Sequence, residues 1–259
     1  GLSLEPRQGN PVPRICETPS GMVNAIGLQN VSVAAFLAEK LPALRDMDTA
    51  VLANVFGETA EEYVEVCRRL DGAPGLAGIE LNVSCPNTRQ GGMEFGVDPA
   101  VLQRLVASVR RVVKLPLIVK LSPNVTDIRD PARAAEQGGA DILSLVNTFT
   151  ALCIDARRQR PVLANKVGGL SGPAIKPMAL YLTHQAASAV KIPLMGMGGI
   201  QTAEDAVEFL LAGAAAIQVG TANFVRPDTA HGLVSGLEAW CSRQGIRRIR
   251  HLTGALKEE

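Results

Sequence analysis

The amino-acid sequence predicts an α/β protein built as a (β/α)8 barrel, and three observations support this fold class. The chain has 259 residues, close to the ~250 that are typical of such barrels. From about residue 49, short apolar segments alternate with helix-like segments in unbroken strand–helix order. The strand segments are almost entirely apolar, which indicates a parallel sheet covered by helices, and glycine-rich loops after them favour a closed barrel over an open sheet.

Six strands are predicted, each of them a short apolar run bounded by Gly, Pro or polar residues. They are Thr49–Val55, Leu76–Val83, Leu117–Leu121, Asp141–Val146, Pro193–Met197 and Ala215–Val219. A barrel of eight strands needs two more, and we expect these to precede Gly1. The sequence is therefore interpreted as one domain, residues 1–259, that lacks its N-terminal strands and opens as a strand ends.

The helices between these strands are predicted from their capping residues and breakers. The helix Thr59–Leu70 is expected to open on a capping box formed by Thr59 and Glu62. Proline at the first turn marks the helix from Asp98 to about Val113. Four further helices are expected at 130–138, 176–190, 202–211 and 227–244. The segment Thr148–Gly172 is long for a strand–helix connection, and such loops are usually functional or mobile.

Composition excludes several classes of function. The formal net charge is +1 and only 3% of the residues are aromatic, so neither a basic field nor a stacking surface points to nucleic acid. No apolar stretch approaches the ~20 residues that span a bilayer, so no membrane association is expected. Five scattered cysteines without a CxxC pair indicate a reducing, cytoplasmic location and no metal site.

A cysteine directly after the second predicted strand is the strongest candidate for catalysis. Cys85 follows the strand that ends near Val83, and Asn82 and Asn87 flank it. Catalytic groups collect at the C-terminal ends of strands in α/β barrels. A thiol there can accept a proton, and amides beside it can hold a substrate by its C=O and N–H groups. A buried structural cysteine in a turn is the alternative interpretation.

Two glycine clusters near the end of the chain indicate a phosphate site. Gly198-Gly199 follows one predicted strand and Gly220-Thr221 follows the next. Backbone N–H groups without an obstructing Cβ bind phosphate well, and the loops after the last two strands are the recurrent phosphate site of barrels. The spacing does not match the dinucleotide fingerprint, so a mononucleotide or a sugar phosphate fits better. Tight turns are the alternative explanation.

Other polar residues are expected at the same mouth of the barrel. Lys120 ends one strand, where its ammonium group could offset negative charge on a ligand, or simply extend to the rim. Asn147 and Thr148 end the next strand, Asn54 ends the first, and Asn24 lies in an apolar loop. Each asparagine alone could be a turn former. Together they suit a planar heterocycle with several C=O and N–H groups.

Five segments, taken together and in this order, resemble the dihydroorotate dehydrogenase family. They are Asn24–Leu28, Asn82–Asn87, Gly168–Lys176, Gly198-Gly199 and Gly220-Thr221. The resemblance runs from Gly1 to about Gly245. The opening Leu2–Arg7 and the segments 24–30 and 169–177 are similar in particular to the catalytic subunit of class 1B. In that class a lysine before the glycine equivalent to Gly1 contacts flavin and substrate, and it is absent here.

The resemblance implies oxidation of (S)-dihydroorotate to orotate in pyrimidine biosynthesis, with FMN across the mouth of the barrel. Cys85 would be the base that takes the C5 proton. The implied substrate-binding residues are Asn24, Ala25, Ile26, Gly27, Leu28, Asn82, Asn147 and Thr148. The implied FMN-binding residues are Asn54, Asn82, Lys120, Val146, Gly172, Gly198, Gly199, Gly220 and Thr221.

The resemblance also implies partners. Electrons would pass to NAD through a second subunit that carries FAD and an iron–sulfur cluster, in a heterotetramer around a homodimer of this chain. Two other functions remain open at this point: a flavin-free barrel lyase or isomerase acting on a phosphorylated substrate, and a non-catalytic fragment. A flavin absorption band in the purified protein would separate the first of these from the dehydrogenase.

Overall fold

The structure is a computed structural model that describes residues 1–83 and 92–257, with the side chains of residues 92–94 left aside. Its centre is a parallel sheet of six strands, ordered β12-β11-β6-β5-β4-β3. The strands are β3 (Val51–Val55), β4 (Leu76–Asn82), β5 (Leu117–Lys120), β6 (Ile142–Leu145), β11 (Leu194–Met197) and β12 (Ala216–Gln218). The six predicted strands are confirmed, in chain order and nearly to the residue.

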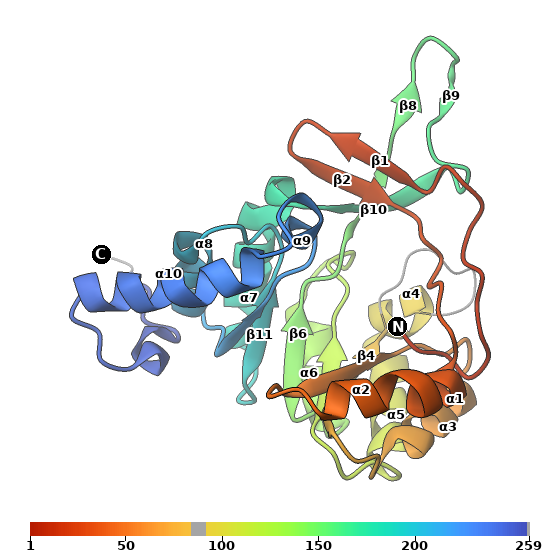
Figure 1. The fold of residues 1–259 in the computed structure, drawn as a ribbon, viewed down its shortest axis with the longest axis horizontal. Helices are drawn as coiled ribbons and strands as arrows, with labels where there is room; N and C mark the ends of the chain where they lie inside the picture. The colour runs from red at the N-terminus through yellow and green to blue at the C-terminus, as the bar shows by residue number, and fades with distance from the viewer. Residues whose placement is uncertain (84–91, 258–259) are drawn as a thin grey trace.

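The sheet curls, and its long helices lie on the convex side (Figure 1). They are α3 (Ala60–Leu70), α5 (Pro99–Arg110), α6 (Arg129–Gln137), α7 (Lys176–Ala187), α8 (Ala203–Leu211) and α10 (Thr229–Arg243). Shorter elements are α1 (Val33–Ala35), η1 (Phe36–Lys40), α2 (Leu41–Arg45), α4 (Gly92–Val97), η2 (Pro173–Ile175), α9 (Ala222–Val225) and η3 (Ile249–Leu252). No helix within the described ranges is long and apolar enough to cross a bilayer.

Most predicted helix starts are confirmed, with one correction. The Thr59 side chain accepts a hydrogen bond from the backbone N–H of Glu62 at 3.3 Å, as expected of an N-cap. The Glu62 carboxylate, however, accepts from the N–H of Glu58 at 2.7 Å, so the predicted reciprocal box does not close. A complete capping box forms instead at the start of α8, between Thr202 and Asp205.

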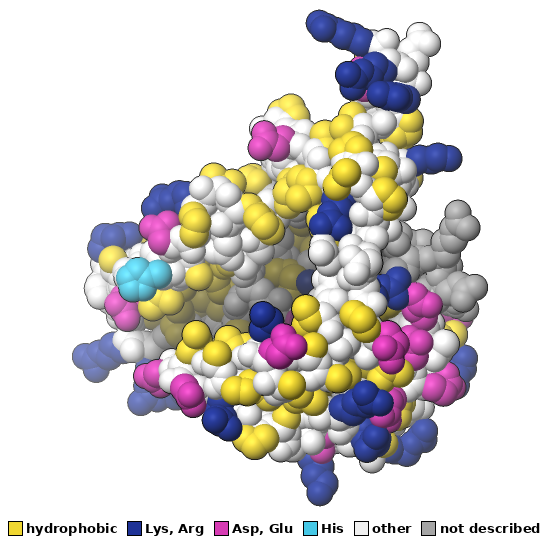
Figure 2. All heavy atoms as spheres, turned by 45° about the vertical axis from the view of Figure 1, so that its right-hand side comes forward, with side chains coloured by type: hydrophobic (Ala, Val, Ile, Leu, Met, Phe, Trp, Pro, Cys, Tyr) yellow, Lys and Arg dark blue, Asp and Glu magenta, His cyan; other side chains and the backbone are white. Residues whose placement is uncertain are grey.

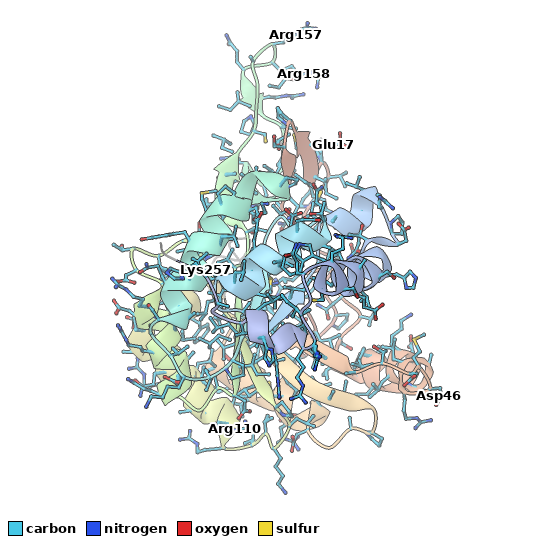
Figure 3. All side chains as sticks on the ribbon, turned by 90° about the vertical axis from the view of Figure 1, so that its left-hand side faces the viewer. Glu17, Asp46, Arg110, Arg157, Arg158 and Lys257 are labelled. Carbon is cyan, nitrogen blue, oxygen red and sulfur yellow. The ribbon has the colours of Figure 1, made fainter. Side chains whose placement is uncertain are left out.

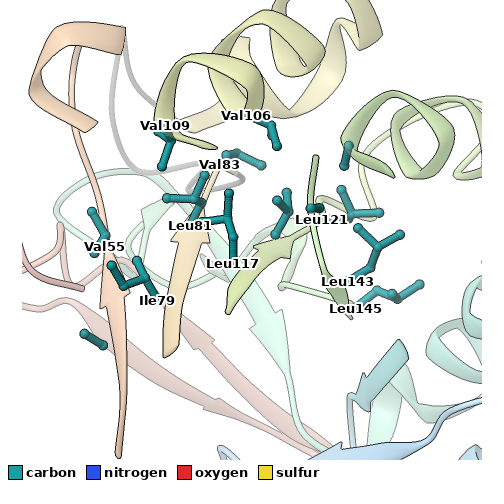
Figure 4. Close-up of a cluster of buried hydrophobic side chains, with 14 of the residues drawn as sticks. Val55, Ile79, Leu81, Val83, Val106, Val109, Leu117, Leu121, Leu143 and Leu145 are labelled. Atoms are coloured by element: carbon teal, nitrogen blue, oxygen red, sulfur yellow. The ribbon is translucent and has the colours of Figure 1, made fainter. Parts of the chain in front are cut away.

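The core lies between the parallel sheet and its helices (Figure 4). Strand residues such as Ile79, Leu117 and Leu143 are fully buried against Val106 and Val109 of α5 and their neighbours. Continuous apolar strands are required here because helices cover the sheet along its length. On another face, Figure 2 shows the molecule hollowed, with hydrophobic side chains visible inside the hollow.

A second, antiparallel sheet stands beside the parallel one and was not predicted. Its order is β1-β2-β10-β7, with β1 (Ile15–Thr18), β2 (Gly21–Asn24), β10 (Val167–Ser171) and β7 (Phe149–Leu152). Sequence reasoning missed it because its strands are short and glycine-rich. A Cβ on Gly169 would lie 1.9 Å from Oγ1 of Thr148, so only glycine lets β10 pass this close.

The segment expected to be a long functional loop supplies three parts of this region. It contains β7, β10 and, between them, an arm formed by β8 (Ile154–Asp155) and β9 (Arg160–Pro161). The arm projects away from the rest of the molecule (Figures 1 and 3), and Arg157 and Arg158 lie at its tip. Near the N-terminus, Leu2 forms an isolated parallel β-bridge with Val55 of β3.

Candidate active site

A cavity of about 490 Å³ lies where the two sheets meet. The C-terminal ends of β5, β6, β11 and β12 form one side, and the β1–β2 turn with the end of β10 forms the other. Its size is within the range of small-ligand sites. Nine of the predicted site residues line it: Lys120, Val146, Asn147, Thr148, Gly172, Gly198, Gly199, Gly220 and Thr221. Residues predicted from separate segments of the sequence therefore converge on one cleft.

The glycine loops form the end of this cleft that suits a phosphate. The backbone N–H groups of Gly199, Gly220 and Thr221 make no hydrogen bond to any other described part of the chain. A Cβ on Gly220 would have nothing within 4 Å, so this glycine faces open space. Donors that lack a protein partner beside unfilled space provide what an anionic ligand requires.

Gly199 has a second role, which is structural. Its φ is +78°, and a Cβ there would lie 2.9 Å from the carbonyl oxygen of Gly172. Gly172 itself has φ +92°. These two glycines are needed for the backbone to follow its path, so they are both turn residues and cleft residues.

The opposite end of the cleft is rich in amides. The Asn147 side chain donates from Nδ2 to Oδ1 of Asn82 at 3.1 Å, and its own Oδ1 accepts from the N–H of Thr148 at 2.8 Å. Asn82 bonds to Asn147 but does not itself line the cleft; it is 8% exposed, and its backbone carbonyl accepts from the hydroxyl of Tyr63 at 2.8 Å. Lys120 pairs in register with Asn82 across β4 and β5 and is half-buried at the cleft. This end therefore offers a cation and oriented amides.

The loop Asn24–Leu28 lies beside the cleft rather than on its lining. Asn24 pairs with Gly169 and donates to that residue's carbonyl oxygen at 3.5 Å. Ala25 is fully buried in a small core with Val23. Gly27 lines a separate cavity of about 400 Å³. Asn54, predicted to bind FMN, also lies off the lining, deeper on the concave face of the sheet. Ile26 and Leu28 do not line the cleft either: the carbonyl oxygen of Ile26 accepts from the N–H of Asn10 at 2.9 Å, and Leu28 packs against the main core.

The lysine of the Gly168–Lys176 segment is structural. Its ammonium nitrogen lies 2.5 Å from a carboxylate oxygen of Asp205 and 2.8 Å from one of Glu208, both on α8. Burial lowers the pKa of Lys176, but hydrogen bonds to these two carboxylates outweigh it and leave the pKa raised. Lys176 therefore joins α7 to α8 and does not line the cleft.

Two residues of this region were missed in the sequence. Glu80 is a carboxylate in the middle of the buried strand β4 and is 6% exposed. Gln218 ends β12 and lines the cleft. Its side chain donates to Glu80 at 2.9 Å. The sequence does contain a signal for both residues, because each is a polar residue inside a segment that is otherwise apolar and predicted as a strand.

Cys85, the predicted base, lies outside the described residues. Among the cysteines that are described, Cys67 is fully buried, and burial raises the pKa of its thiol to about 12. A thiol with that pKa does not act as a base near neutral pH. No cluster of three or more metal-ligating side chains occurs in the part of the chain that the structure describes.

Comparisons with known proteins agree with this geometry. The family model for dihydroorotate dehydrogenase matches residues 1–240. The chain is 56% identical over 257 residues to the catalytic subunit of dihydroorotate dehydrogenase B (NAD+) from Pelobacter propionicus, covering 99% of this chain and 84% of that one. A relative from Trichlorobacter lovleyi with the same name matches at the same identity and coverage.

Two further matches are a relative with a different name and a solved structure. A relative from Solibacter usitatus, also 56% identical, is provisionally named dihydroorotate dehydrogenase A (fumarate). The crystal structure of a dihydroorotate dehydrogenase from Eimeria tenella, in complex with ferulenol, superposes with a TM-score of 0.83 at 21% identity. It covers 98% of this chain and 77% of its own, which supports the predicted barrel-type fold. The family model and the identities together show that this chain belongs to the dihydroorotate dehydrogenase family.

Proposed function

We propose that this chain is the catalytic subunit of a class 1B dihydroorotate dehydrogenase, which oxidises (S)-dihydroorotate to orotate with FMN and NAD. The observation that carries the proposal is the convergence of nine separately predicted residues on one cleft between the two sheets. The relatives named as NAD-linked catalytic subunits support the choice of acceptor and the need for a partner subunit. That partner would carry FAD and an iron–sulfur cluster.

The cleft fits FMN on chemical grounds. Gly199, Gly220 and Thr221 offer backbone N–H groups, without protein partners among the described residues, to a phosphate. Lys120 lies toward the other end of the cleft, beside its register partner Asn82, where the two side chains suit the C=O and N–H groups of a flavin ring. Val146 and Gly172, also assigned to the cofactor by the family resemblance, line the same cleft, whereas Asn54 does not. When bound, FMN supplies the acceptor for the hydride that leaves C6 of the substrate.

The chain's own residues then have distinct roles. Cys85 accepts the proton that leaves C5 of dihydroorotate as the hydride leaves C6, so that the C5–C6 double bond of orotate forms. Asn82, Asn147 and Thr148, with the loop Asn24–Leu28, hold the pyrimidine and its carboxylate. The ammonium group of Lys120 stabilises negative charge that develops on the ligand at this end of the cleft.

Replacement of Cys85 tests this assignment. We expect Cys85→Ala to retain FMN and to slow flavin reduction by dihydroorotate by about 10²–10⁴-fold, the usual contribution of a general base. Cys85→Ser should recover part of the rate only at raised pH, because a hydroxyl is a much weaker acid than a thiol. Stopped-flow absorbance of the flavin band measures both, with Cys241→Ala as the control. Near-normal reduction by Cys85→Ala would remove Cys85 from the mechanism.

A simpler measurement separates the proposal from a flavin-free lyase or isomerase on a phosphorylated substrate. The purified protein, supplied with FMN and dialysed, should keep a flavin absorption band that dihydroorotate bleaches without oxygen. A colourless protein under these conditions would rule out the flavoenzyme.

A further inference from the structure

The concave face of the parallel sheet holds a buried carboxylate that the mechanism above does not use. Glu80, on β4, is 6% exposed and accepts hydrogen bonds from three other strands. The donors are Nδ2 of Asn54 on β3 at 2.6 Å, Oγ of Ser144 on β6 at 2.7 Å and Nε2 of Gln218 on β12 at 2.9 Å. Because β3 and β12 are the two edges of the sheet, one side chain joins both edges across the concave face.

The chemistry of Glu80 fixes how its neighbours are oriented. An ionised carboxylate only accepts hydrogen bonds, and an amide nitrogen only donates them. The amide nitrogens of Asn54 and Gln218 therefore face Glu80, and their carbonyl oxygens point elsewhere. For Asn54 the oxygen faces Gly1, since a Cβ on Gly1 would lie 2.7 Å from Oδ1. Gln218, in contrast, lines the cleft.

We infer that Glu80 is a positioning residue for the flavin: it holds the Gln218 amide with its carbonyl oxygen available to the cleft and keeps a fixed negative charge behind it. This inference rests on the proposed function. A carbonyl acceptor matches the ring N–H of a flavin's pyrimidine end. A carboxylate in a poorly solvated site disfavours the additional negative charge of the reduced cofactor. Glu80 thus lowers the midpoint potential of the bound flavin.

Glu80→Gln in the full chain tests the inference, because it keeps the volume and removes the charge. Asn54 donates to one carboxylate oxygen and Ser144 and Gln218 donate to the other, so the new amide turns its N–H groups either toward Asn54 or toward Gln218. In both orientations the Gln218 amide loses its charged acceptor and is held less firmly. We expect the dissociation constant of FMN, measured by flavin fluorescence, to rise about tenfold. We also expect binding to shift about tenfold in favour of the reduced form, which for a two-electron couple raises the midpoint potential by about 30 mV.

The matched control is Glu136→Gln. The Glu136 carboxylate accepts from the N–H groups of Lys191 and Ile192 at 2.7 and 3.1 Å, away from the cleft, so neither FMN affinity nor potential should change. If Glu80→Gln does not fold, Ser144→Ala carries the test. Removal of one donor leaves the carboxylate charge less shielded, so the potential should fall.

The possible failures are distinguishable. Wild-type chain that binds no FMN would overturn the proposed function, and this inference with it. Wild-type chain that binds FMN, with a potential unchanged in Glu80→Gln, or in Ser144→Ala where that variant carries the test, would overturn the inference alone.

Discussion

At the scale of single residues, the glycines show which features of the site the sequence can predict and which it cannot. The clusters Gly198-Gly199 and Gly220-Thr221 were predicted as phosphate loops, and both line the cleft. The sequence could not separate glycines that the backbone requires from glycines that leave room for a ligand. Gly199 belongs to the first kind, with φ +78° and backbone atoms close by, whereas Gly220 has open space and no such φ. That difference depends on distant segments that fold against each loop.

The distinction makes Gly220 the better probe of the cofactor site. We expect Gly220→Val to leave the thermal midpoint of the apoprotein nearly unchanged and to weaken FMN binding by at least tenfold, because the side chain fills ligand space. Gly232→Val is the control, since Gly232 also has open space but lies on α10, outside the cleft lining. Fluorescence titration gives the affinity. Unchanged FMN binding in Gly220→Val would mean that the phosphate binds elsewhere.

At the scale of secondary structure, the parallel strands could be predicted and the antiparallel sheet could not. Strands such as Leu117–Lys120 are apolar throughout because helices cover them, and that pattern is visible in one segment. Strand β10 has no such pattern: its glycines are there because β2 and β7 approach it from both sides. Asn24 was predicted to lie in a loop for the same reason: it is the last residue of β2, and that strand shows no apolar pattern in its own sequence.

The contact between α7 and α8 gives a stability prediction at this scale. Asp205 accepts from Lys176 at 2.5 Å and from the N–H groups of Gln201 and Thr202 at 2.9 and 2.8 Å, with its side chain 14% exposed. The two N–H groups bond to one carboxylate oxygen, which an asparagine can still supply, so Asp205→Asn keeps the volume and the capping acceptor but loses the ion pair with Lys176. We expect it to cost about 1–2 kcal/mol in the free energy of unfolding. Glu204→Gln, an exposed carboxylate on the same helix, is the control and should cost little.

The interaction between Asp205 and Lys176 also makes the free energy of unfolding depend on pH. Burial raises the pKa of Asp205, but bonds from Lys176, Gln201 and Thr202 outweigh it and leave the pKa below the ordinary 3.8. The unfolded state therefore binds more protons than the folded state as the pH falls past 3.8, so this stabilisation is present above that pH and lost below it. Urea unfolding of wild type and Asp205→Asn at pH 7 and pH 3 checks the sign. A stability gap that widens at pH 3 would contradict it.

At the scale of the whole molecule, the cleft belongs to neither sheet alone. The parallel sheet contributes the loops after β11 and β12, and the antiparallel sheet contributes the β1–β2 turn and the end of β10. At the glycine end, the only side-chain hydrogen bond that links the two walls within the described residues joins the hydroxyls of Thr221 and Ser171, at 2.8 Å. A ligand between the walls would add contacts that the protein does not make by itself.

This arrangement predicts a bipartite footprint for FMN. In hydrogen-exchange mass spectrometry, saturating FMN should slow exchange in both walls together: in residues 198–201 and 220–222 of the parallel sheet, and in residues 19–22 and 171–173 beside the antiparallel one. At 100 times its dissociation constant, FMN should also add about 2.7 kcal/mol to the free energy of unfolding by mass action. The arm of residues 154–161 projects away from the cleft, so its exchange should not change and serves as the internal control (Figure 1). Protection confined to the parallel sheet would show that the cofactor contacts one wall only, and the antiparallel sheet would then have no part in holding it.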